Sequence, residues 1–212
     1  PSRIPSERPG QDGGKRDLNR RLRTQSLLAG SLELFLTHGL EAVTIDELAK
    51  AGGVAKGSFY RYFDSKADVV RVIYEPLLTR LSRIFSTCEA ALKDAHNPDQ
   101  LFAAYGALGQ DLANMLMEVP KLVRLYLQES RGPATETRAP ISALSQLISK
   151  RAVELTQIAR QHGMLRDIHP QVSALTVIGS IERIVQAYLN GDLQPSAEVV
   201  IHDLVSLVLD GL

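Results

Sequence analysis

A cluster of polar side chains lies between residues 44 and 66, where two short apolar segments flank a pair of glycines. Ammonium, guanidinium and hydroxyl groups are the donors that bind phosphate oxygens and base edges in DNA. Four such residues fall together on one side of the second segment: Lys56, Ser58, Tyr60 and Arg61. Their types and spacing therefore favour a surface that contacts a nucleic acid.

Two short helices must position these side chains. Thr44 precedes the first helix, and Glu47 follows three residues later, which is the pattern of a capping box. Gly53 permits a tight turn after this helix, because a left-handed backbone costs glycine little. The second helix is expected over residues 54–63. Two short helices joined by a glycine turn are typical of a helix-turn-helix, whose second helix enters the major groove.

Phe59 and Phe63 occupy the inner face of the second helix and would fill the space between the two helices. The pattern is also compatible with a plain helical hairpin inside an all-α protein. Upstream, a helix over residues 20–38 carries its own apolar stripe and ends at Gly39, so it would brace the pair as a third helix.

The whole block resembles the DNA-binding domain of the tetracycline-repressor (TetR) family of bacterial transcriptional regulators. The resemblance runs from about Arg23 to Val69. It rests on Phe35, Gly39, Thr44, Ile45 to Ala49, Gly53, Val54, Lys56, Gly57, Ser58, Tyr60, Tyr62, Phe63, Ser65 and Lys66.

The resemblance implies that Thr44, Tyr60 and Lys66 hold phosphates. Ala55 departs from the family pattern, which usually has Ser or Thr there to cap the recognition helix. The lost hydroxyl leaves open a third class of protein, an all-α scaffold or partner-binding module whose helix-turn-helix no longer reads DNA.

By the same resemblance, Lys56, Gly57, Ser58 and Arg61 lie toward the bases, and Gly57 lets the backbone approach the DNA. The implied function is that of a ligand-responsive repressor that binds a near-palindromic operator as a homodimer. A small-molecule effector would release it.

Composition is consistent with a regulator that touches DNA through one small face. The 212 residues have 44% hydrophobic content and a net charge of zero. Residues 1–66 carry 11 Lys and Arg against 8 Asp and Glu, a net of +3, which leaves −3 for the remainder.

Cys88 is the single cysteine, which excludes an internal disulfide and suits a reducing cytoplasm. We expect no membrane span, and the first residues lack the apolar stretch of a signal peptide.

Residues 1–19 are rich in Pro, Gly and Arg, so we expect a flexible basic arm. Residues 1–14 have the character of a solvated tail. For Lys15 to Arg21, a tail and an arm that lies in a neighbouring DNA groove are equally compatible with the sequence.

The remaining chain predicts helices and no strands. After the helix-turn-helix domain at 20–66, residues 67–212 would form a helical ligand-binding and dimerisation domain. Pro76 falls inside the first of its helices, where it is either a harmless bend or a joint toward the DNA-binding domain. The fold class is therefore all-α with about nine helices, expected over residues 20–38, 45–51, 54–63, 66–95, 98–117, 120–130, 141–162, 170–190 and 196–212.

The last two helices are apolar around most of their circumference, and a helix of this kind needs more than one buried side. They are either central in one monomer or paired across a homodimer as a four-helix interface. We favour the homodimer. The residues predicted at its interface are Ile178, Ile181, Val185, Val200, Leu204, Val205 and Val208.

Polar and polarisable residues among the aliphatics of this domain predict a small-molecule pocket, although each taken singly is equally typical of a core. The predicted pocket residues are Tyr105, Met115, Tyr126, Glu129, Glu182 and Gln186. No cofactor motif, catalytic set or helical metal pair is present in the sequence. The rival enzyme class would use Glu129, Glu182 and a histidine as acid-base groups.

Overall fold

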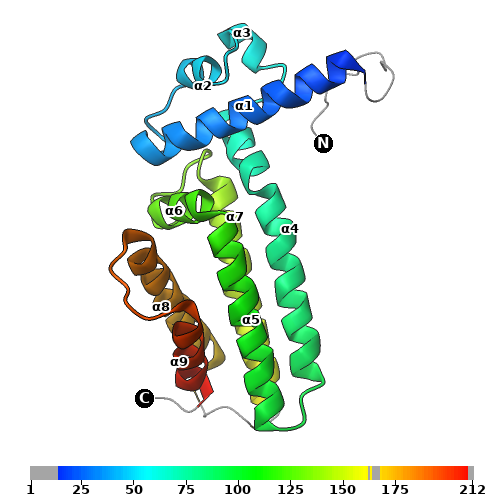
Figure 1. Cartoon of the computed structure of the whole chain (residues 1–212), viewed down its shortest axis with the longest axis vertical. Helices are drawn as coiled ribbons and strands as arrows, with labels where there is room; N and C mark the ends of the chain where they lie inside the picture. Colours follow the sequence, from blue (N-terminus) through cyan, green and yellow to red (C-terminus); the bar gives the residue numbers. More distant parts are fainter. Residues whose placement is uncertain (1–13, 162, 164–167, 210–212) are drawn as a thin grey trace. The chain divides into compact units, whose positions relative to one another are not determined.

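The computed structural model describes residues 14–161, 163 and 168–209 (Figure 1). These residues form helices without any strand, which confirms the all-α prediction. In chain order the described helices are α1 (Lys15–His38), α2 (Ile45–Ala51), α3 (Lys56–Phe59), α4 (Lys66–Lys93), α5 (Pro98–Glu118), α6 (Pro120–Glu129), α7 (Ala139–Gln161), α8 (Pro170–Asn190) and α9 (Ala197–Leu209). They divide into two compact units after Val69.

Helix α1 begins at Lys15, five residues before its predicted start at residue 20. Residues 15–19 are therefore helical and do not belong to the predicted flexible arm; the rest of that prediction, residues 1–13, lies outside the described residues. No glycine or proline follows Gly14 in this stretch, and Arg21 pairs with Asp17 at 3.0 Å. Such a pair four residues apart supports a helix.

The first unit is closed by apolar side chains from α1, α2 and α3. Leu27, Phe35, Leu48 and Phe59 are fully buried there. Two glycines allow the tight connection between α2 and α3. Gly53 has φ +67°, as its predicted turn requires, whereas a Cβ on Gly52 would lie 2.2 Å from Leu27 Cδ2.

The second unit contains most of α4 together with α5 to α9. Helix α7 packs against α8, and α5 packs against α9. The core includes Tyr74 of α4, which is fully buried and donates a hydrogen bond from its hydroxyl to the Leu122 carbonyl at 2.9 Å. Pro76 lies inside α4, as predicted.

Helix α8 is the one described helix with the length and apolar composition of a membrane span, and only 6% of that stretch is buried. Length and composition alone are weak evidence for a span, so the expectation of no membrane span stays a prediction. Glu182 and Arg183 lie within the helix, and the centre of a bilayer disfavours such charges. We interpret its apolar surface as a surface for protein contact.

Candidate nucleic-acid interface and ligand cavity

The predicted recognition helix is shorter than its expected span of 54–63. Helix α3 covers Lys56–Phe59, and the following residues form a turn. In that turn Arg61 N donates to Ser58 O at 3.1 Å, and Tyr62 N donates to Phe59 O at 2.8 Å. These bonds span three residues, and such bonds tighten the end of a helix into a turn.

Ala55 is the N-cap of α3 and makes no side-chain capping bond, as expected of a residue without a hydroxyl. The first backbone N–H groups of this short helix therefore lack the partner that Ser or Thr supplies in the family pattern. An external anion is the kind of group that satisfies such donors.

The polar side chains that the sequence predicts are brought together on α3 and its turn. Lys56 and Arg61 are exposed, Ser58 is half-buried, and Tyr60 is 50% exposed and packs edge-on against the buried ring of Phe59. Lys56 Nζ lies 3.1 Å from Asp46 Oδ2 on α2. Both partners are exposed, and pairs of this kind contribute about 0–1 kcal/mol, so a phosphate could displace Asp46.

Gly57 has no role in the packing of the chain. A Cβ placed on it would meet no atom within 4 Å, and its φ is not positive. The backbone at Gly57 is exposed beside Lys56 and Ser58. The absence of a side chain there therefore leaves room for a molecule outside the chain.

Thr44 forms the predicted capping box. Its Oγ1 accepts from Glu47 N at 3.3 Å, and its own N–H donates to Glu47 Oε2 at 2.8 Å. The bond from the Thr44 backbone lowers the pKa of Glu47. Thr44 is exposed and remains close enough to the surface to contact a phosphate.

The ammonium group of Lys66, which was predicted to hold a phosphate, contacts backbone carbonyls of the same chain. Its Nζ donates to the carbonyl oxygens of Leu40 at 2.7 Å, Glu41 at 3.1 Å and Val43 at 2.9 Å. An ammonium has three N–H donors, so these bonds use all of them. We therefore assign Lys66 to positioning the segment before α2 and no longer to holding a phosphate.

An apolar cavity of about 510 Å³ lies in the second unit. Side chains from α4 to α9 line it, and Tyr105, Met115, Tyr126 and Glu182 are among them. These four of the six predicted pocket residues are thus brought together. Glu129 and Gln186, the other two predicted residues, are not among the lining residues.

Glu129 and Gln186 lie elsewhere for different reasons. Glu129 is 5% exposed, and its Oε2 accepts from Arg138 Nε at 2.8 Å, so it is held in a buried ion pair beside the α6–α7 connection. Gln186 is exposed on α8. Neither position could be predicted from the sequence, because helical periodicity does not tell the cavity side of a helix from its other sides.

Glu182 is the only charged residue among the described residues that line the cavity. The hydroxyl of Tyr126 donates to Glu182 Oε1 at 3.0 Å, and Arg131 Nη2 donates to Oε2 at 3.0 Å. Burial raises the pKa of Tyr126 to about 12. Arg131 was not predicted from the sequence, because it lies in the connection after α6 and 51 residues from its partner.

Most of the residues predicted at a dimer interface line this cavity in the single chain. Val205 is 6% exposed. Six of the seven line the cavity: Ile178, Ile181, Val185, Val200, Leu204 and Val205. The side chain of Val208 lies outside the described residues. The apolar residues of α8 and α9 that are exposed in one chain are Val172, Leu175, Tyr188, Val199 and Leu207.

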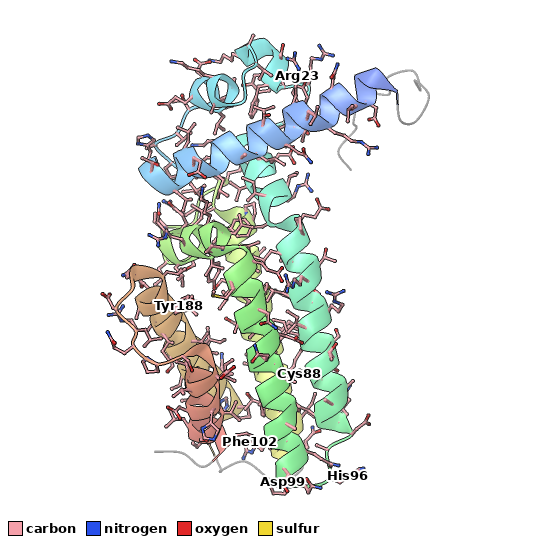
Figure 2. All side chains as sticks on the ribbon, in the orientation of Figure 1. Arg23, Cys88, His96, Asp99, Phe102 and Tyr188 are labelled. Atoms are coloured by element: carbon pink, nitrogen blue, oxygen red, sulfur yellow. The ribbon has the colours of Figure 1, made fainter. Side chains whose placement is uncertain are left out.

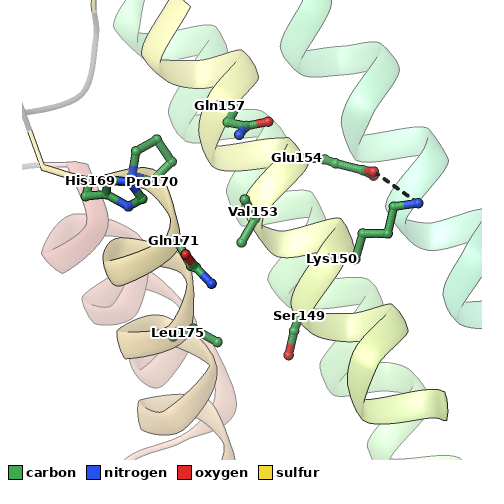
Figure 3. A pocket seen from close by; sticks show the side chains of 9 residues that line it. All are labelled: Ser149, Lys150, Val153, Glu154, Gln157, His169, Pro170, Gln171 and Leu175. Carbon is green, nitrogen blue, oxygen red and sulfur yellow. Dashed lines mark ion pairs between the residues drawn. The ribbon is translucent and has the colours of Figure 1, made fainter.

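A second hollow of about 370 Å³ lies between α7 and the start of α8 (Figure 3). Lys150 and Glu154 form an ion pair at 3.9 Å along its α7 side. Leu175 lies on the α8 side and is exposed. The mixed polar and apolar lining is typical of a surface groove, and it contrasts with the apolar cavity.

Two other chemistries are absent from the described residues. They contain no group of three or more His, Cys, Asp or Glu side chains that could hold a metal ion. Cys88 on α4 is buried, and its Sγ lies 3.8 Å from the Ala104 carbonyl (Figure 2). Burial raises the pKa of the Cys88 thiol to about 12, which disfavours the reactive thiolate.

Residues 27–73 match the family model described as bacterial regulatory proteins of the tetR family. The transcriptional regulator AcuR of Cereibacter sphaeroides is 38% identical over 85 residues, which are 40% of this chain and 38% of AcuR. Residues 27–73 therefore form a DNA-binding domain of the TetR type. The aligned relative is named as a transcriptional regulator, and this likeness favours a regulator over the enzyme alternative. The aligned part spans well under half of AcuR's length.

The TetR fold extends over both units. A putative fatty acid metabolism regulator of Clostridium perfringens superposes with a TM-score of 0.72 at 19% identity, covering 88% of this chain and 98% of that one. FadR of Bacillus subtilis, solved in complex with stearoyl-CoA, gives a TM-score of 0.66 at 16% identity, covering 89% and 98%. At these identities the comparison shows that the chain shares its fold with these regulators.

Proposed function

We propose that the chain is a DNA-binding transcriptional repressor that acts as a homodimer on a near-palindromic operator and is released by a small-molecule effector. The observation that carries the DNA-binding part is Gly57. It is an exposed glycine that the chain's own packing does not require, and it lies between Lys56 and Ser58 at the start of α3. In the cytoplasm, where we place the protein, such a surface would meet duplex DNA.

The proposed contacts follow from the exposed groups around Gly57. Lys56, Ser58 and Arg61 reach toward base edges, and Thr44 and Tyr60 reach toward phosphates. Ala55 leaves backbone N–H groups at the start of α3 for a phosphate oxygen. Phosphate contacts fix the register of the protein, and contacts to base edges select the sequence.

The exposed apolar surface of α8 and α9 supports the homodimer. Val172 and Leu175 lie on α8, and Val199 and Leu207 lie on α9, all exposed in a single chain. Large apolar side chains exposed together on a surface typically mark a protein contact. A two-fold dimer presents two recognition elements about one DNA turn apart, which is why a near-palindromic operator is expected.

The cavity supports a response to an effector, because 510 Å³ lies within the usual range of small-molecule sites. FadR of Bacillus subtilis, of similar fold, was solved with stearoyl-CoA. An effector changes DNA affinity only if it favours one conformation over another. We propose that it acts through α4, with Pro76 as a joint.

Selection of bound sequences from random duplex DNA tests the proposal. We expect a near-palindromic consensus and an affinity that falls steeply with salt, because bound phosphates release counterions. Arg61→Ala should weaken binding to that consensus by about tenfold or more. Arg83→Ala, which removes an exposed arginine of α4, is the matched control and should bind normally. Recovery of no consensus would favour the scaffold alternative.

A further inference from the structure

Among the described residues that line the cavity, which are mostly apolar, Glu182 is the one that carries a charge. We propose that the effector is a lipophilic amine, an apolar molecule that ends in a positively charged ammonium group bound by Glu182. This inference rests on the proposed function, since it names the class of the effector that the cavity would hold.

The apolar body of the ligand follows from the mostly aliphatic lining and from three lining hydroxyl groups that already have partners within the chain. Tyr105 donates to the Leu155 carbonyl at 3.4 Å, and Thr156 donates to the Ala152 carbonyl at 2.8 Å. At the exposed end of α8, Tyr188 contacts Met117 Sδ at 3.0 Å. A ligand along these walls would therefore be held chiefly by burial of apolar surface.

The charge of the ligand follows from the geometry of Glu182. An ionised carboxylate can accept about four hydrogen bonds. The structure gives Glu182 two, one from Tyr126 and one from Arg131. The carboxylate thus keeps capacity for a donor on the ligand, whereas an anionic head group beside it would meet like charge in a poorly solvated site.

Arg131 pairs with Glu182 but does not remove the preference of the cavity for a cationic ligand. Its side chain is 77% exposed, whereas that of Glu182 is 18% exposed, and Arg131 is not among the lining residues. The guanidinium therefore approaches Glu182 from the solvent side. An exposed partner of this kind is held weakly and can be displaced by a ligand ammonium.

Ligand binding would also alter a contact between three segments. Tyr126 lies on α6, Arg131 lies in the connection that follows it, and Glu182 lies on α8. An ammonium that takes the place of Arg131 releases the connection from α8. The same group would therefore recognise the effector and change how these segments are tied together.

Calorimetry with matched ten-carbon probes tests the inference on the full chain without DNA. The probes are decylammonium, decan-1-ol, decanoate and decanoyl-CoA. We expect decylammonium to bind roughly ten- to hundredfold more tightly than decanoate, because the ammonium forms a charge-assisted bond to Glu182 whereas the carboxylate of decanoate meets a like charge. Equal or tighter binding of decanoate or decanoyl-CoA would overturn the proposal.

Variants separate recognition from folding. Glu182→Gln should reduce decylammonium binding to the level of decan-1-ol and leave decan-1-ol unchanged. Arg131→Gln should act in the opposite direction and strengthen decylammonium binding, because it removes a competitor. Glu75→Gln, an exposed carboxylate of α4 outside the lining, is the control and should change neither. Weaker decylammonium binding in Arg131→Gln would count against the proposal.

Operator release distinguishes this inference from the proposed function. If the probes bind in the expected order but decylammonium leaves the operator complex intact, the proposed release by an effector is wrong and the proposed ammonium site is supported. If the protein binds its operator but the probes show no charge preference, the proposed ammonium site is wrong and the proposed DNA binding is supported.

Discussion

Lys66 Nζ lies 2.7 Å from the carbonyl oxygen of Leu40, and this bond joins the first turn of α4 to the segment that precedes α2. Two further carbonyls, of Glu41 and Val43, complete the contacts of the ammonium. The segment leads directly into the capping box of Thr44 and Glu47. Lys66 therefore fixes the start of α2 from within the N-terminal unit.

This geometry predicts that Lys66→Gln acts on stability and not on phosphate binding. The lost bonds should lower the free energy of unfolding by about 1.5–3 kcal/mol, the range for a hydrogen bond to a charged group. The salt dependence of operator binding by the folded protein should not change. If Lys66 instead held a phosphate, the slope of log affinity against log salt would become shallower by about 1. Lys50→Gln on the exposed end of α2 is the control.

Gly57→Leu is predicted to remove operator binding without harming the fold. A Cβ at this exposed position meets no atom of the chain within 4 Å, so the midpoint of thermal unfolding should not fall. Gel-shift affinity should drop by about a hundredfold or more, because the side chain fills space meant for DNA. Gly106→Ala tests the general effect of replacing an unpacked helical glycine, which stabilises by about 1 kcal/mol, and it should bind DNA normally. Normal DNA binding by Gly57→Leu would move the interface away from α3.

Leu175→Glu is predicted to convert the dimer into monomers. The residue is exposed in one chain, so a charge there costs little within the monomer but opposes burial against a second copy. Sedimentation velocity should show the change in mass, with an unchanged helix content by circular dichroism. Leu22→Glu makes the same substitution at an exposed leucine of α1, and this variant should stay dimeric. A charge at Val205 is a poorer test, because that side chain is buried.

Stability is predicted to fall at alkaline pH, in part through Cys88. Its folded pKa is raised to about 12, above the ordinary value of 9.0, so the folded state keeps its proton after the unfolded state has lost it. The unfolded state then binds fewer protons, and the free energy of unfolding decreases as pH rises from about 9 toward 12. For this group the loss is on the order of 2 kcal/mol by pH 11.

Urea unfolding of wild type and Cys88→Val at pH 8 and pH 11 measures that contribution. Valine does not ionise, so the variant should lose less stability between the two pH values than wild type. Tyr126, whose pKa burial raises to about 12, has the same sign of effect and is retained in both proteins. Equal losses in the two proteins would show that Cys88 titrates normally when folded.

The helix-turn-helix was readable from local sequence because its determinants are local. Thr44 and Glu47 are three residues apart, and the positive φ at Gly53 belongs to the turn itself. The early start of α1 and the short α3 were not predicted, because apolar periodicity indicates that a helix exists but not where it ends. Helix ends depend on weaker local interactions. Residues 15–19 add an ion pair to α1, whereas the bonds after Phe59 close a turn.

What the sequence by itself determined is the set of helices, the capped turn and the residues that gather on α3. Only the tertiary structure decided which apolar faces surround a cavity and which are exposed, as Val205 and Leu175 illustrate. The physical reason is that apolar periodicity records that a side chain avoids water, and it does not record what covers it. Bonds between distant residues, such as Lys66 with Leu40 and Arg131 with Glu182, exist only once the helices have packed.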